Sequence, residues 1–515
     1  MNARQHLIVI KGKDQTDKVA SFRFHEKKCD VVYIGVPDKT YQFQRANVEI
    51  FPLQKEIDLT RVIVTVNGQA IDDISALLDF GKFYRLVRSG KKNLLLERNE
   101  VKLQKNCLTE AKSKEAFQYF KKIATAISLE DENGFNILHE QYDKIQRIGE
   151  DMVLASYLDP KKEIRTLQIP KTVIYPFGLN QSQKLAVERA LSSKISIIQG
   201  PPGTGKTQTI LNIIANVVRS GKTVAVVSQN NSATHNVVEK LEKKNVSFLT
   251  AFLGNAANVQ QFLDTQTGIY PDMRDWEMPA KERRQLEREM ANLCKELNAR
   301  LGIKNRIAEI EQKLLQLNLE QQYFAEYYAT CNLAPTENSN GLSSQKISAL
   351  WMEVEQHAIK GTRMHLLQKL SILFRFNARA IKLFLRAPEQ VIPYLQNQFY
   401  NIRRKELEEE KQAQLYKLER YAFDAKMDEL TRKSLQLFRA DLAARYLWQS
   451  GRMRFEKYDF SEKAMEFTRE YPVVLSTTYS IARTLPNYAY DYLIVDEASQ
   501  VDLATGVATL SCARN

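Results

Sequence analysis

Cysteine is scarce in this sequence, and the few cysteines present are scattered. Five cysteines are spread over 515 residues, and no two of them form a CxxC pair. Disulfide-rich secreted modules and zinc ribbons both depend on closely spaced cysteine pairs. The sequence therefore excludes both of these classes.

Long apolar runs are absent too. No stretch of about 18 uncharged apolar residues occurs, which is the length that a membrane-spanning helix needs. The N-terminal segment MNARQHLIVIKGKDQ turns polar after four apolar residues, so it lacks the apolar core of a signal peptide. We expect a soluble, cytoplasmic protein that has no membrane partner.

Charge, by contrast, is plentiful and unbalanced. Lysine and arginine number 74 and aspartate and glutamate 61, which gives a formal net charge of +13. A surplus of this size favours a polyanionic partner. Hydrophobic residues make up 44% of the chain, which is enough to build a buried core. The length of 515 residues predicts about three or four domains.

Residues 1–104 have the pattern of a β-rich accessory domain. The segment VIVTVNG (62–68) is strand-like and ends in an Asn-Gly turn, which is a hairpin signal. Residues 82–103 hold two further strand-like runs with Ser-Gly between them, so a barrel-like or open sheet is expected. In residues 105–177, apolar residues three or four apart predict a helical stalk, and three prolines in 159–177 mark a linker after it.

Residues 178–258 change to the pattern of a parallel α/β unit. Continuous apolar runs are typical of strands that are buried on both faces. A Gly-rich turn and a helix separate the first two runs, as in a strand–loop–helix–strand unit. A third run follows far along the chain, with an acidic pair at its carboxyl end. The expected elements are a strand at KISIIQ (194–199), a helix from about Lys206 to Arg219 that ends before Gly221, a strand at TVAVVS (223–228) and a strand within YDYLIVDEAS (490–499).

A long charged segment, residues 259–451, separates these strands. Apolar residues recur three or four apart along 286–317 and again along 415–425. This spacing predicts two long helices that pair as an antiparallel coiled-coil hairpin inserted into the α/β domain. Between them, residues 346–386 carry eight Lys or Arg residues against two Glu residues, which makes a basic tip. Contact with nucleic acid, contact with a protein and a merely solvated face all remain open for the insertion.

The segment GPPGTGKT (200–207) matches G-x-x-x-x-G-K-[ST] and stands between an expected strand and an expected helix. Its glycines allow backbone N–H groups to turn inward around a phosphate without a Cβ clash. The positive end of the following helix dipole faces the same anion. Lys206 reaches the β- and γ-phosphates, and the Thr207 hydroxyl is a Mg²⁺ ligand. The expected ATP-binding loop consists of Gly200, Pro201, Pro202, Gly203, Thr204, Gly205, Lys206, Thr207 and Gln208.

The acidic half of the site is LIVDEASQ (493–500), at the end of an apolar strand. Asp496 is placed to hold Mg²⁺ through water, and Glu497 to orient and deprotonate the attacking water. An Asp-Glu pair on its own often does no more than cap the next helix. Together with the phosphate loop it indicates hydrolysis of a nucleoside triphosphate, because that reaction needs both halves.

Combined with DEASQ, the loop GPPGTGKT resembles that of the superfamily 1B helicases of the up-frameshift type. The segment GLNQSQKLAVERAL (178–191) is similar to that family's Q motif, whose glutamine reads the adenine edge. Gln183 matches that position, and Gln181 is the alternative. Gln500 matches a glutamine that contacts the γ-phosphate in the family and couples it to nucleic acid. The resemblance thus implies catalytic roles for Lys206, Glu497 and Gln500, and an adenine contact for Gln183.

Two further segments resemble the parts of such helicases that contact the phosphodiester backbone. VVSQNNSATHNVVEKL (226–241) is similar to motif Ia, and VVLSTTYSIAR (473–483) to the segment before motif II. The same polar residues are also common in turns and helix caps, so both interpretations stay open. Contacts of this kind would make binding of single-stranded DNA or RNA tolerant of sequence and dependent on salt. The positions carried over are Ser228, Asn231, Asn236, Thr477 and Thr478.

The resemblance implies an α/β, RecA-like P-loop NTPase fold with a parallel sheet for residues 178–258 together with 452–515. The β-rich N-terminus and the helical insertion stand where the family carries accessory parts. The sequence stops at Asn515, before the family's motif III and its second RecA-like domain. That domain supplies arginines, and such arginines are worth about 10³–10⁵ in rate in related NTPases. We therefore expect an N-terminal helicase fragment that binds ATP, hydrolyses it slowly and needs the second domain as a partner.

The function implied is that of an ATP-dependent helicase, which hydrolyses ATP to ADP and phosphate while moving along single-stranded DNA or RNA. Three alternatives compete with it. An AAA+ ATPase shares GPPGTGKT but places its acidic strand about one βαβ unit later. A coiled-coil ATPase of the chromosome-maintenance kind would need an LSGGQ-like signature before the acidic strand, and residues 471–492 contain none. A nucleic-acid-binding scaffold with weak ATPase activity suits the basic insertion, but the intact phosphate loop and acidic pair argue against it.

Overall fold

The computed structural model describes most of the chain. Outside its description are residues 1–4, 67–68, 72, 128–133, 135, 160, 162–165, 230, 332–341, 360–387 and 487, and the side chains of residues 69, 231–233 and 388–389. Of the basic residues expected at the tip of the insertion, all but Lys346 lie outside the described residues. The Asn-Gly turn at 67–68 lies outside them as well.

Two compact units make up the chain. The first comprises residues 1–177, 183–283 and 435–515, and the second comprises residues 178–182 and 284–434. The first unit therefore contains the N-terminal strands, the phosphate loop and the acidic strand, and the second contains most of the helical insertion. Across both units, no helix among the described residues is long and apolar enough to cross a membrane.

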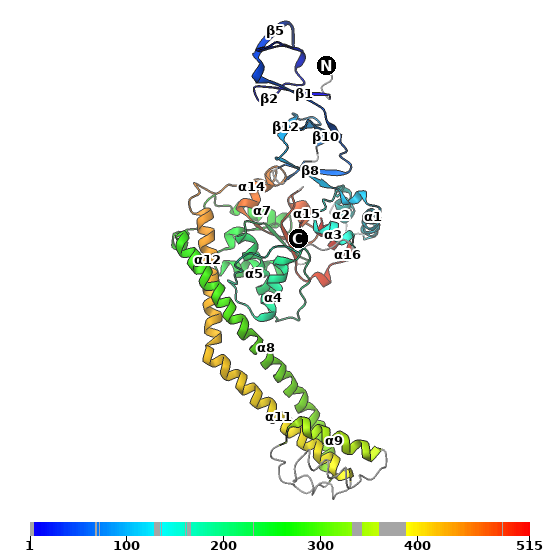
Figure 1. Cartoon of the computed structure of the whole chain (residues 1–515), viewed down its shortest axis with the longest axis vertical. Helices are drawn as coiled ribbons and strands as arrows, with labels where there is room; N and C mark the ends of the chain where they lie inside the picture. The colour runs from blue at the N-terminus through cyan, green and yellow to red at the C-terminus, as the bar shows by residue number, and fades with distance from the viewer. Residues whose placement is uncertain are drawn as a thin grey trace. The chain divides into compact units, whose positions relative to one another are not determined.

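The N-terminal part of the first unit is built of antiparallel strands, which confirms the β-rich prediction (Figure 1). Its described residues form four small sheets, in the orders β2-β1-β6, β3-β4-β5, β12-β11-β10-β7 and β13-β8-β9. Val66 faces Gln69 across β8 and β9, which pair antiparallel. The strands are β1 (His6–Ile10), β2 (Lys13–Asp14), β3 (Val19–Phe24), β4 (Lys28–Tyr33), β5 (Val36–Gln44), β6 (Val48–Pro52), β7 (Lys55–Ile57), β8 (Val62–Val66), β9 (Gln69–Ala70), β10 (Ile74–Asp79), β11 (Phe83–Arg88), β12 (Leu94–Glu97) and β13 (Val101–Lys105).

Three short helices follow the strands: α1 (Ala111–Ala126), α2 (Ile137–Lys144) and α3 (Val153–Leu158). They share a hydrophobic core with α16 (Leu503–Leu510), the helix that comes after the acidic motif. The Tyr142 hydroxyl donates a 2.7 Å hydrogen bond to the Ala504 carbonyl within this core. The helical segment thus packs against α16 of the α/β domain.

A parallel sheet forms the centre of the first unit and confirms the predicted α/β class (Figure 1). Its strands lie in the order β15 (Thr250–Phe252), β16 (Val473–Thr477), β14 (Val224–Ser228) and β17 (Tyr492–Val495). All neighbouring strands are parallel, and every residue of β14 is buried. The helices of this domain are α4 (Gln181–Ser192), α5 (Lys206–Arg219), α6 (Asn231–Glu242), α7 (Ala256–Thr265), α13 (Asp459–Glu462), α14 (Ala464–Glu470) and α15 (Ile481–Thr484).

The prediction of a buried strand at KISIIQ (194–199) is wrong in this structure. These residues form no strand, and the Ile197 side chain is 83% exposed. A parallel strand needs hydrogen-bond partners at its edge. Among the described residues, β17, which ends the sheet on this side, pairs only with β14 and, through the Leu493 N–H, with the Asn515 carbonyl. An apolar run without a neighbouring strand cannot satisfy its backbone groups in a sheet, so it stays irregular.

The ends of α5 follow the prediction from local sequence. The helix begins at Lys206 and ends at Arg219. Gly221 has a φ of +72°, and its N–H donates a 2.9 Å hydrogen bond to the Val218 carbonyl. A glycine tolerates this left-handed conformation, which turns the chain out of the helix and into β14.

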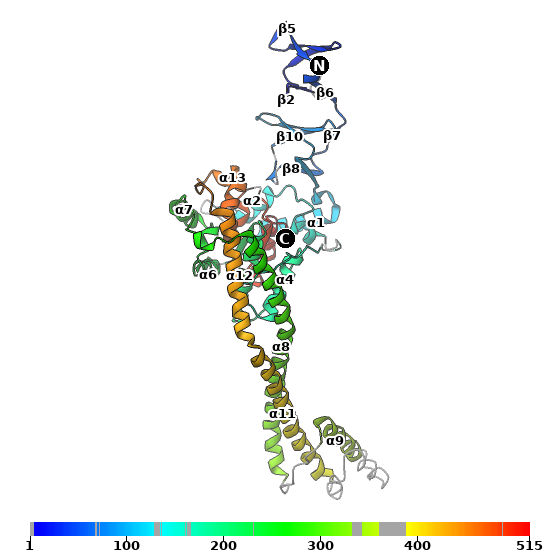
Figure 2. The ribbon, with the colours of Figure 1, turned by 60° about the vertical axis from the view of Figure 1, so that its left-hand side comes forward.

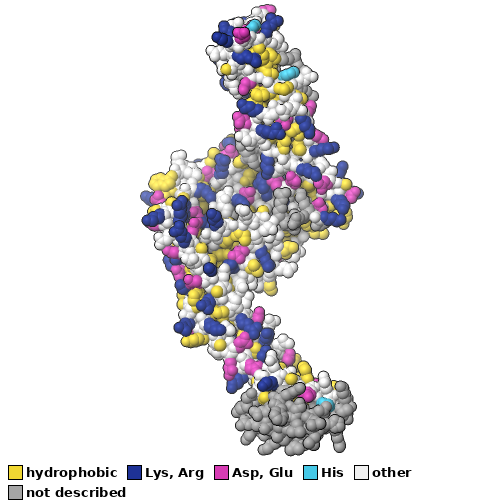
Figure 3. Space-filling view, in the orientation of Figure 1, with side chains coloured by type: hydrophobic (Ala, Val, Ile, Leu, Met, Phe, Trp, Pro, Cys, Tyr) yellow, Lys and Arg dark blue, Asp and Glu magenta, His cyan; other side chains and the backbone are white. Residues whose placement is uncertain are grey.

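The second unit is dominated by long helices that run antiparallel, side by side in both views (Figure 1 and Figure 2). Ion pairs join Arg306 to Glu410 at 2.8 Å and Glu289 to Lys433 at 2.7 Å, so residue numbers rise on one helix as they fall on the other. Both charge signs occur along the face in view (Figure 3), which is typical of a solvated helix pair. The helices are α8 (Ala280–Thr330), α9 (Ser344–Ile359), α11 (Pro388–Tyr421) and α12 (Phe423–Tyr446), of which α8 and α12 begin or end in the first unit.

Candidate nucleotide site

The phosphate loop GPPGTGKT leads into the N-terminus of α5 and depends on its glycines. Gly203 and Gly205 have φ values of +85° and +82°, which L-residues with a Cβ rarely adopt. A Cβ on Gly200 would stand 2.6 Å from the Thr204 Oγ1 atom. Three of the loop positions therefore accept only glycine without local rearrangement.

The loop places a helix N-terminus where an anion can bind. Gly205 is the N-cap residue of α5 and contributes no capping side chain. The first N–H groups of a helix lack partners within the helix, and the helix dipole adds a partial positive charge there. Pro201, Pro202, Gly203 and Thr204 form the exposed turn of the loop, and the Thr204 hydroxyl donates to the Pro201 carbonyl at 2.8 Å.

Lys206 is the charged centre of the site. Its ammonium lies 3.1 Å from a carboxylate oxygen of Glu497 and donates a 3.2 Å hydrogen bond to the Gly200 carbonyl. The two charged side chains are 29% and 39% exposed, so solvent screens the pair only in part. The fold thus brings the phosphate loop and the acidic strand into direct contact, and a bound phosphate would compete with Glu497 for the ammonium.

The acidic pair stands directly after β17. Burial raises the pKa of Asp496, and the negative charge of Glu497 raises it further. Two contacts lower it: the hydrogen bond that Asp496 accepts from the Glu497 N–H, and the positive charge of Lys206. Glu497 itself has a φ of 52° and a ψ of 42°, in the left-handed region. Non-glycine residues held in that region are uncommon and cluster at functional sites.

Two side chains here fit a Mg²⁺ ion. Mg²⁺ prefers oxygen ligands and keeps several waters, so one or two protein ligands are enough when phosphates supply the others. The Thr207 hydroxyl at the start of α5 and the Asp496 carboxylate directly after β17 are donors of that kind. The donor set therefore suits Mg²⁺ held mainly by phosphate and water.

The glutamines predicted at the site lie in different surroundings. Gln183 is only 7% exposed, and its side-chain amide donates to the Thr204 carbonyl and to Gln208 Oε1, each at 3.1 Å. Gln208 in turn donates to the Phe177 carbonyl. Gln183 thus supports the backbone of the phosphate loop, a contact that the sequence comparison with the Q motif does not predict. Gln500, by contrast, is exposed, in a short 3₁₀ turn (Ala498–Gln500) after Glu497.

Three of the residues predicted to contact nucleic acid lie at the carboxyl ends of β14 and β16. Ser228 pairs with Thr477 across the two strands, and the Thr478 N–H donates to the Ser228 carbonyl at 3.3 Å. Ser228 and Thr478 are 3% and 1% exposed, whereas Thr477 is partly accessible. Asn236 is exposed on α6, and the Asn231 side chain lies outside the described residues. The sheet therefore gathers Ser228, Thr477 and Thr478, and α6 carries the two asparagines.

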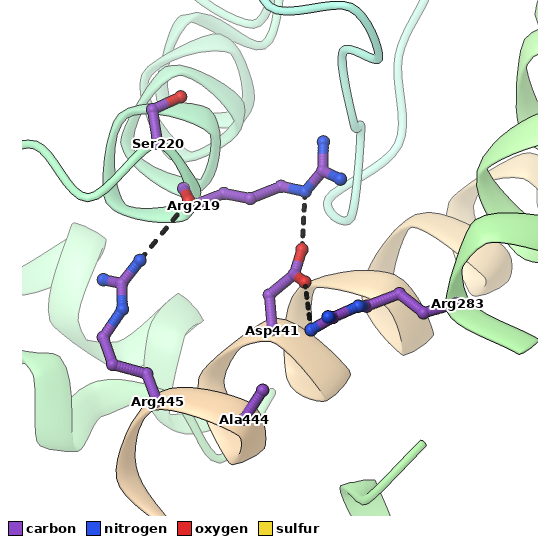
Figure 4. A pocket seen from close by; sticks show the side chains of 6 residues that line it. All are labelled: Arg219, Ser220, Arg283, Asp441, Ala444 and Arg445. Atoms are coloured by element: carbon purple, nitrogen blue, oxygen red, sulfur yellow. Dashed lines mark hydrogen bonds and ion pairs between the residues drawn. The ribbon is translucent and has the colours of Figure 1, made fainter. Parts of the chain in front are cut away.

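A charged cavity at the other end of α5 has no signal in the sequence (Figure 4). It measures about 370 Å³, and three arginines and one aspartate line it. Asp441 accepts from Arg219 at 2.6 Å and from Arg283 at 3.2 Å. Arg445 donates to the carbonyls of Val218 and Arg219, so its positive charge neutralises part of the negative end of the α5 dipole. Because the partners stand more than 150 positions apart in sequence, no local pattern could have revealed this junction.

The family assignment follows from a comparison with known families. A model described as an AAA domain matches residues 178–513, which is more than half of the chain. The chain belongs to this AAA domain family. The match begins before Gln183 and ends after Gln500, so both halves of the candidate site lie within it.

Several proteins are similar to parts of this AAA domain chain. DNA-binding protein SMUBP-2 from Mesocricetus auratus is 44% identical over 77 residues, which is 15% of this chain and 8% of that protein. An uncharacterized ATP-dependent helicase, MJ0104, from Methanocaldococcus jannaschii is 38% identical over 106 residues, 20% of this chain and 16% of that protein. A regulator of nonsense transcripts 1 homolog from Drosophila melanogaster is 45% identical over 69 residues, 13% of this chain and 6% of that protein.

These similarities confirm the resemblance to superfamily 1 helicases of the up-frameshift type. The matched segments span less than a fifth of each relative's own length. The family is thereby shown.

Proposed function

We propose that this chain carries the first motor domain of an ATP-dependent helicase, which hydrolyses ATP to ADP and phosphate as it moves on single-stranded DNA or RNA. One observation carries the proposal. The Lys206 ammonium and the Glu497 carboxylate stand 3.1 Å apart although they come from opposite ends of the domain's sequence. Hydrolysis of a nucleoside triphosphate needs a phosphate-binding cation and a group that positions water, and the fold puts the two together.

Each residue then has a defined task. Lys206 and the N-terminus of α5 bind the β- and γ-phosphates, and Glu497 orients the attacking water and accepts its proton. Thr207 and Asp496 would hold Mg²⁺, which neutralises phosphate charge when bound. Gln500, exposed beside Glu497, is assigned the γ-phosphate contact that its position in the motif implies. Gln183 is assigned to nucleotide binding through its support of the loop, in addition to the adenine contact.

The names of the relatives support ATP as the nucleotide. The relatives from Methanocaldococcus jannaschii and Saccharomyces cerevisiae are both named as ATP-dependent helicases, the second as a putative RNA helicase. The hamster relative is named as a DNA-binding protein. These names support ATP and a nucleic acid for this chain, and both DNA and RNA remain candidates for the strand.

The strand would pass over the carboxyl ends of β14 and β16. Thr477 and Asn236 are the accessible polar side chains there, so they are assigned direct phosphate contacts. Ser228 and Thr478 are buried, so their part would be to shape the turn through their backbone groups. Asn231 is assigned a contact with the phosphodiester backbone, as its position in motif Ia implies.

The division of labour along the chain is also a proposal. Residues 1–104 and 105–177 serve as accessory parts, and residues 178–258 with 452–515 as the motor domain. The insertion, 259–451, would contact nucleic acid or a protein partner. A second RecA-like domain would complete the ATP site with its arginines, which implies slow turnover by this chain alone.

Phosphate release from ATP, measured with and without single-stranded DNA or RNA, tests the function. Lys206→Ala removes the phosphate-binding cation, and Lys243→Ala removes an exposed lysine of the same domain as a matched control. Turnover that a strand stimulates, and that only Lys206→Ala abolishes, would support the proposal and identify the preferred strand. Turnover that survives Lys206→Ala would contradict it.

A further inference from the structure

The charged cavity at the C-terminal end of α5 gathers side chains from three helices (Figure 4). They come from the end of α5, the start of α8 and the end of α12, and all of them belong to the first compact unit. We call this cavity the arginine pocket. It measures about 370 Å³, and its described lining consists of Arg219, Ser220, Arg283, Asp441, Ala444 and Arg445.

The arginine pocket carries more positive than negative charge. Three guanidinium groups and one carboxylate line it, so three positive charges against one negative charge leave a formal surplus of +2. Asp441 accepts from Arg219 at 2.6 Å and from Arg283 at 3.2 Å, so both of its oxygens are already engaged. Arg219 and Asp441 are only 15% and 18% exposed. Water therefore screens the repulsion among the guanidinium groups only in part, and a bound anion would relieve it.

The arginines are held in place and still have hydrogen-bond donors available. Arg445 donates to the carbonyls of Val218 and Arg219 at 3.0 and 3.3 Å, which fixes it against the end of α5. A guanidinium carries five N–H donors. Asp441 takes one of those of Arg283, and no other described residue takes a second. Arg283 can therefore donate to a ligand without giving up its contact with Asp441.

We propose that the arginine pocket binds a small anion that carries a phosphate group. The planar fork of arginine matches the oxygens of phosphate, and hydrogen bonds between charged groups are about twice as strong as neutral ones. A phosphate group with two negative charges would balance the surplus of +2, whereas a single carboxylate would balance only half of it. The cavity of about 370 Å³ falls within the range of small-ligand sites, about 300–1,000 Å³.

The arginine pocket is separate from the phosphate loop. Helix α5 has 14 residues and begins at Lys206, and a helix rises about 1.5 Å per residue. About 20 Å therefore separate Lys206 from Arg219 at the other end. The six described lining residues include no aromatic ring on which a nucleotide base could stack, so the phosphate group is the part that the pocket would recognise. Such a group can bind there whether or not the loop binds ATP.

Calorimetric titration with inorganic phosphate and with pyrophosphate tests the arginine pocket. The chain carries Lys206→Ala throughout, because Lys206 would otherwise bind the same anions at the phosphate loop. We expect saturable binding of at least one anion with a dissociation constant of about 1 mM or below. Tighter binding of pyrophosphate would identify a ligand with two phosphate groups, and tighter binding of phosphate a ligand with one. Saturable binding of neither anion would overturn the proposal.

Substitutions locate the anion. Arg283→Gln should weaken binding at least about 10-fold, because it removes a charge and the donor fork. Arg283→Lys keeps the charge without the fork, so its affinity should lie between those of the parent and Arg283→Gln. Arg274→Gln is the matched control, because Arg274 pairs with Asp272 at 2.6 Å on the surface of the same unit, and it should change nothing. Binding that Arg283→Gln leaves unchanged, or that Arg274→Gln weakens equally, would overturn the proposal.

Chemical labelling of arginines reads the pocket without a substitution in it, so a variant that fails to fold cannot obscure the result. Phenylglyoxal modifies accessible guanidinium groups, and mass spectrometry maps the modified residues. Arg283, which is 30% exposed, should react more slowly as phosphate or pyrophosphate is added, whereas Arg274, which is 79% exposed, should react at a constant rate. Arg283 labelling that neither anion slows would contradict the proposal. Protection of Arg283 by a single-stranded oligonucleotide alone would overturn it in favour of a strand.

Discussion

Replacing Gly205 by alanine tests the contact between Gln183 and the phosphate loop. Gly205 has a φ of +82°, and a Cβ at this position would stand 2.1 Å from Nε2 of Gln183. No side chain tolerates an approach that close, so Gln183 would have to move. Its amide would then lose the hydrogen bonds to the Thr204 carbonyl and to Gln208.

The expected cost has two parts. Holding alanine in the left-handed region costs roughly 1–2 kcal/mol. Each hydrogen bond that Gln183 gives up contributes about 0.5–1.5 kcal/mol net. Gly205→Ala should therefore lower the free energy of unfolding by roughly 2–5 kcal/mol, and it should weaken nucleotide binding because the loop loses its support.

Gly203→Ala is the matched control. Gly203 has a similar φ of +85°, but a Cβ there would meet nothing within 4 Å. It should cost only the backbone part, about 1–2 kcal/mol. Urea unfolding of both variants measures the difference, and in a Gln183→Ala background the cost of Gly205→Ala should fall to that of Gly203→Ala. Equal losses for the two glycines in the parent chain would refute the role given to Gln183.

Three further perturbations have definite expected results. Glu497→Gln removes the carboxylate that pairs with Lys206 at 3.1 Å, so a fluorescent ATP analogue should bind at least as tightly. Phosphate release should fall about 100-fold or more, because the base that accepts the proton of the attacking water is lost. Weaker binding of the analogue would refute the view that Glu497 competes with phosphate for the Lys206 ammonium. Asp441→Asn weakens two partly buried arginine contacts and should cost about 1–3 kcal/mol in urea unfolding, whereas Asp272→Asn, at an exposed arginine pair, should change little. Burial raises the pKa of Cys512 to about 12, so its thiol should resist alkylation at pH 8 until the chain unfolds. In the unfolded chain the thiol ionises near its ordinary pKa of about 8.5. The contribution of Cys512 to the free energy of unfolding should therefore fall as the pH rises above about 8.5. Rapid alkylation of the folded chain at Cys512, mapped by mass spectrometry, would contradict that assignment.

Local features of the site could be predicted because their causes lie within a few residues. The spacing of glycine, lysine and threonine in residues 200–207 requires a tight loop, and Gly203 and Gly205 do adopt left-handed backbone. The apolar period of α5 ends at Arg219, and Gly221 turns the chain where a helix-ending glycine is expected. Each of these depends on backbone geometry that short segments impose on themselves.

Features that join distant segments could not be predicted in this way. KISIIQ has the composition of a buried strand, but a strand exists only where another strand pairs with it, and none of the described residues does. The contact of Gln183 with the loop depends on how α4 packs against α5, which no motif encodes. Asp441 and Arg219 meet only because α12 returns to the end of α5.

The sequence by itself determined the parallel α/β class, the phosphate loop and the acidic strand, since each depends on the spacing and polarity of adjacent residues. Only the tertiary structure decided that Lys206 forms an ion pair with Glu497, that burial raises the pKa of Asp496 and that residues 194–199 line a largely apolar cavity. The physical reason is that these properties are distances and solvent exposures between segments far apart in the chain. Such quantities have no value until the chain has folded.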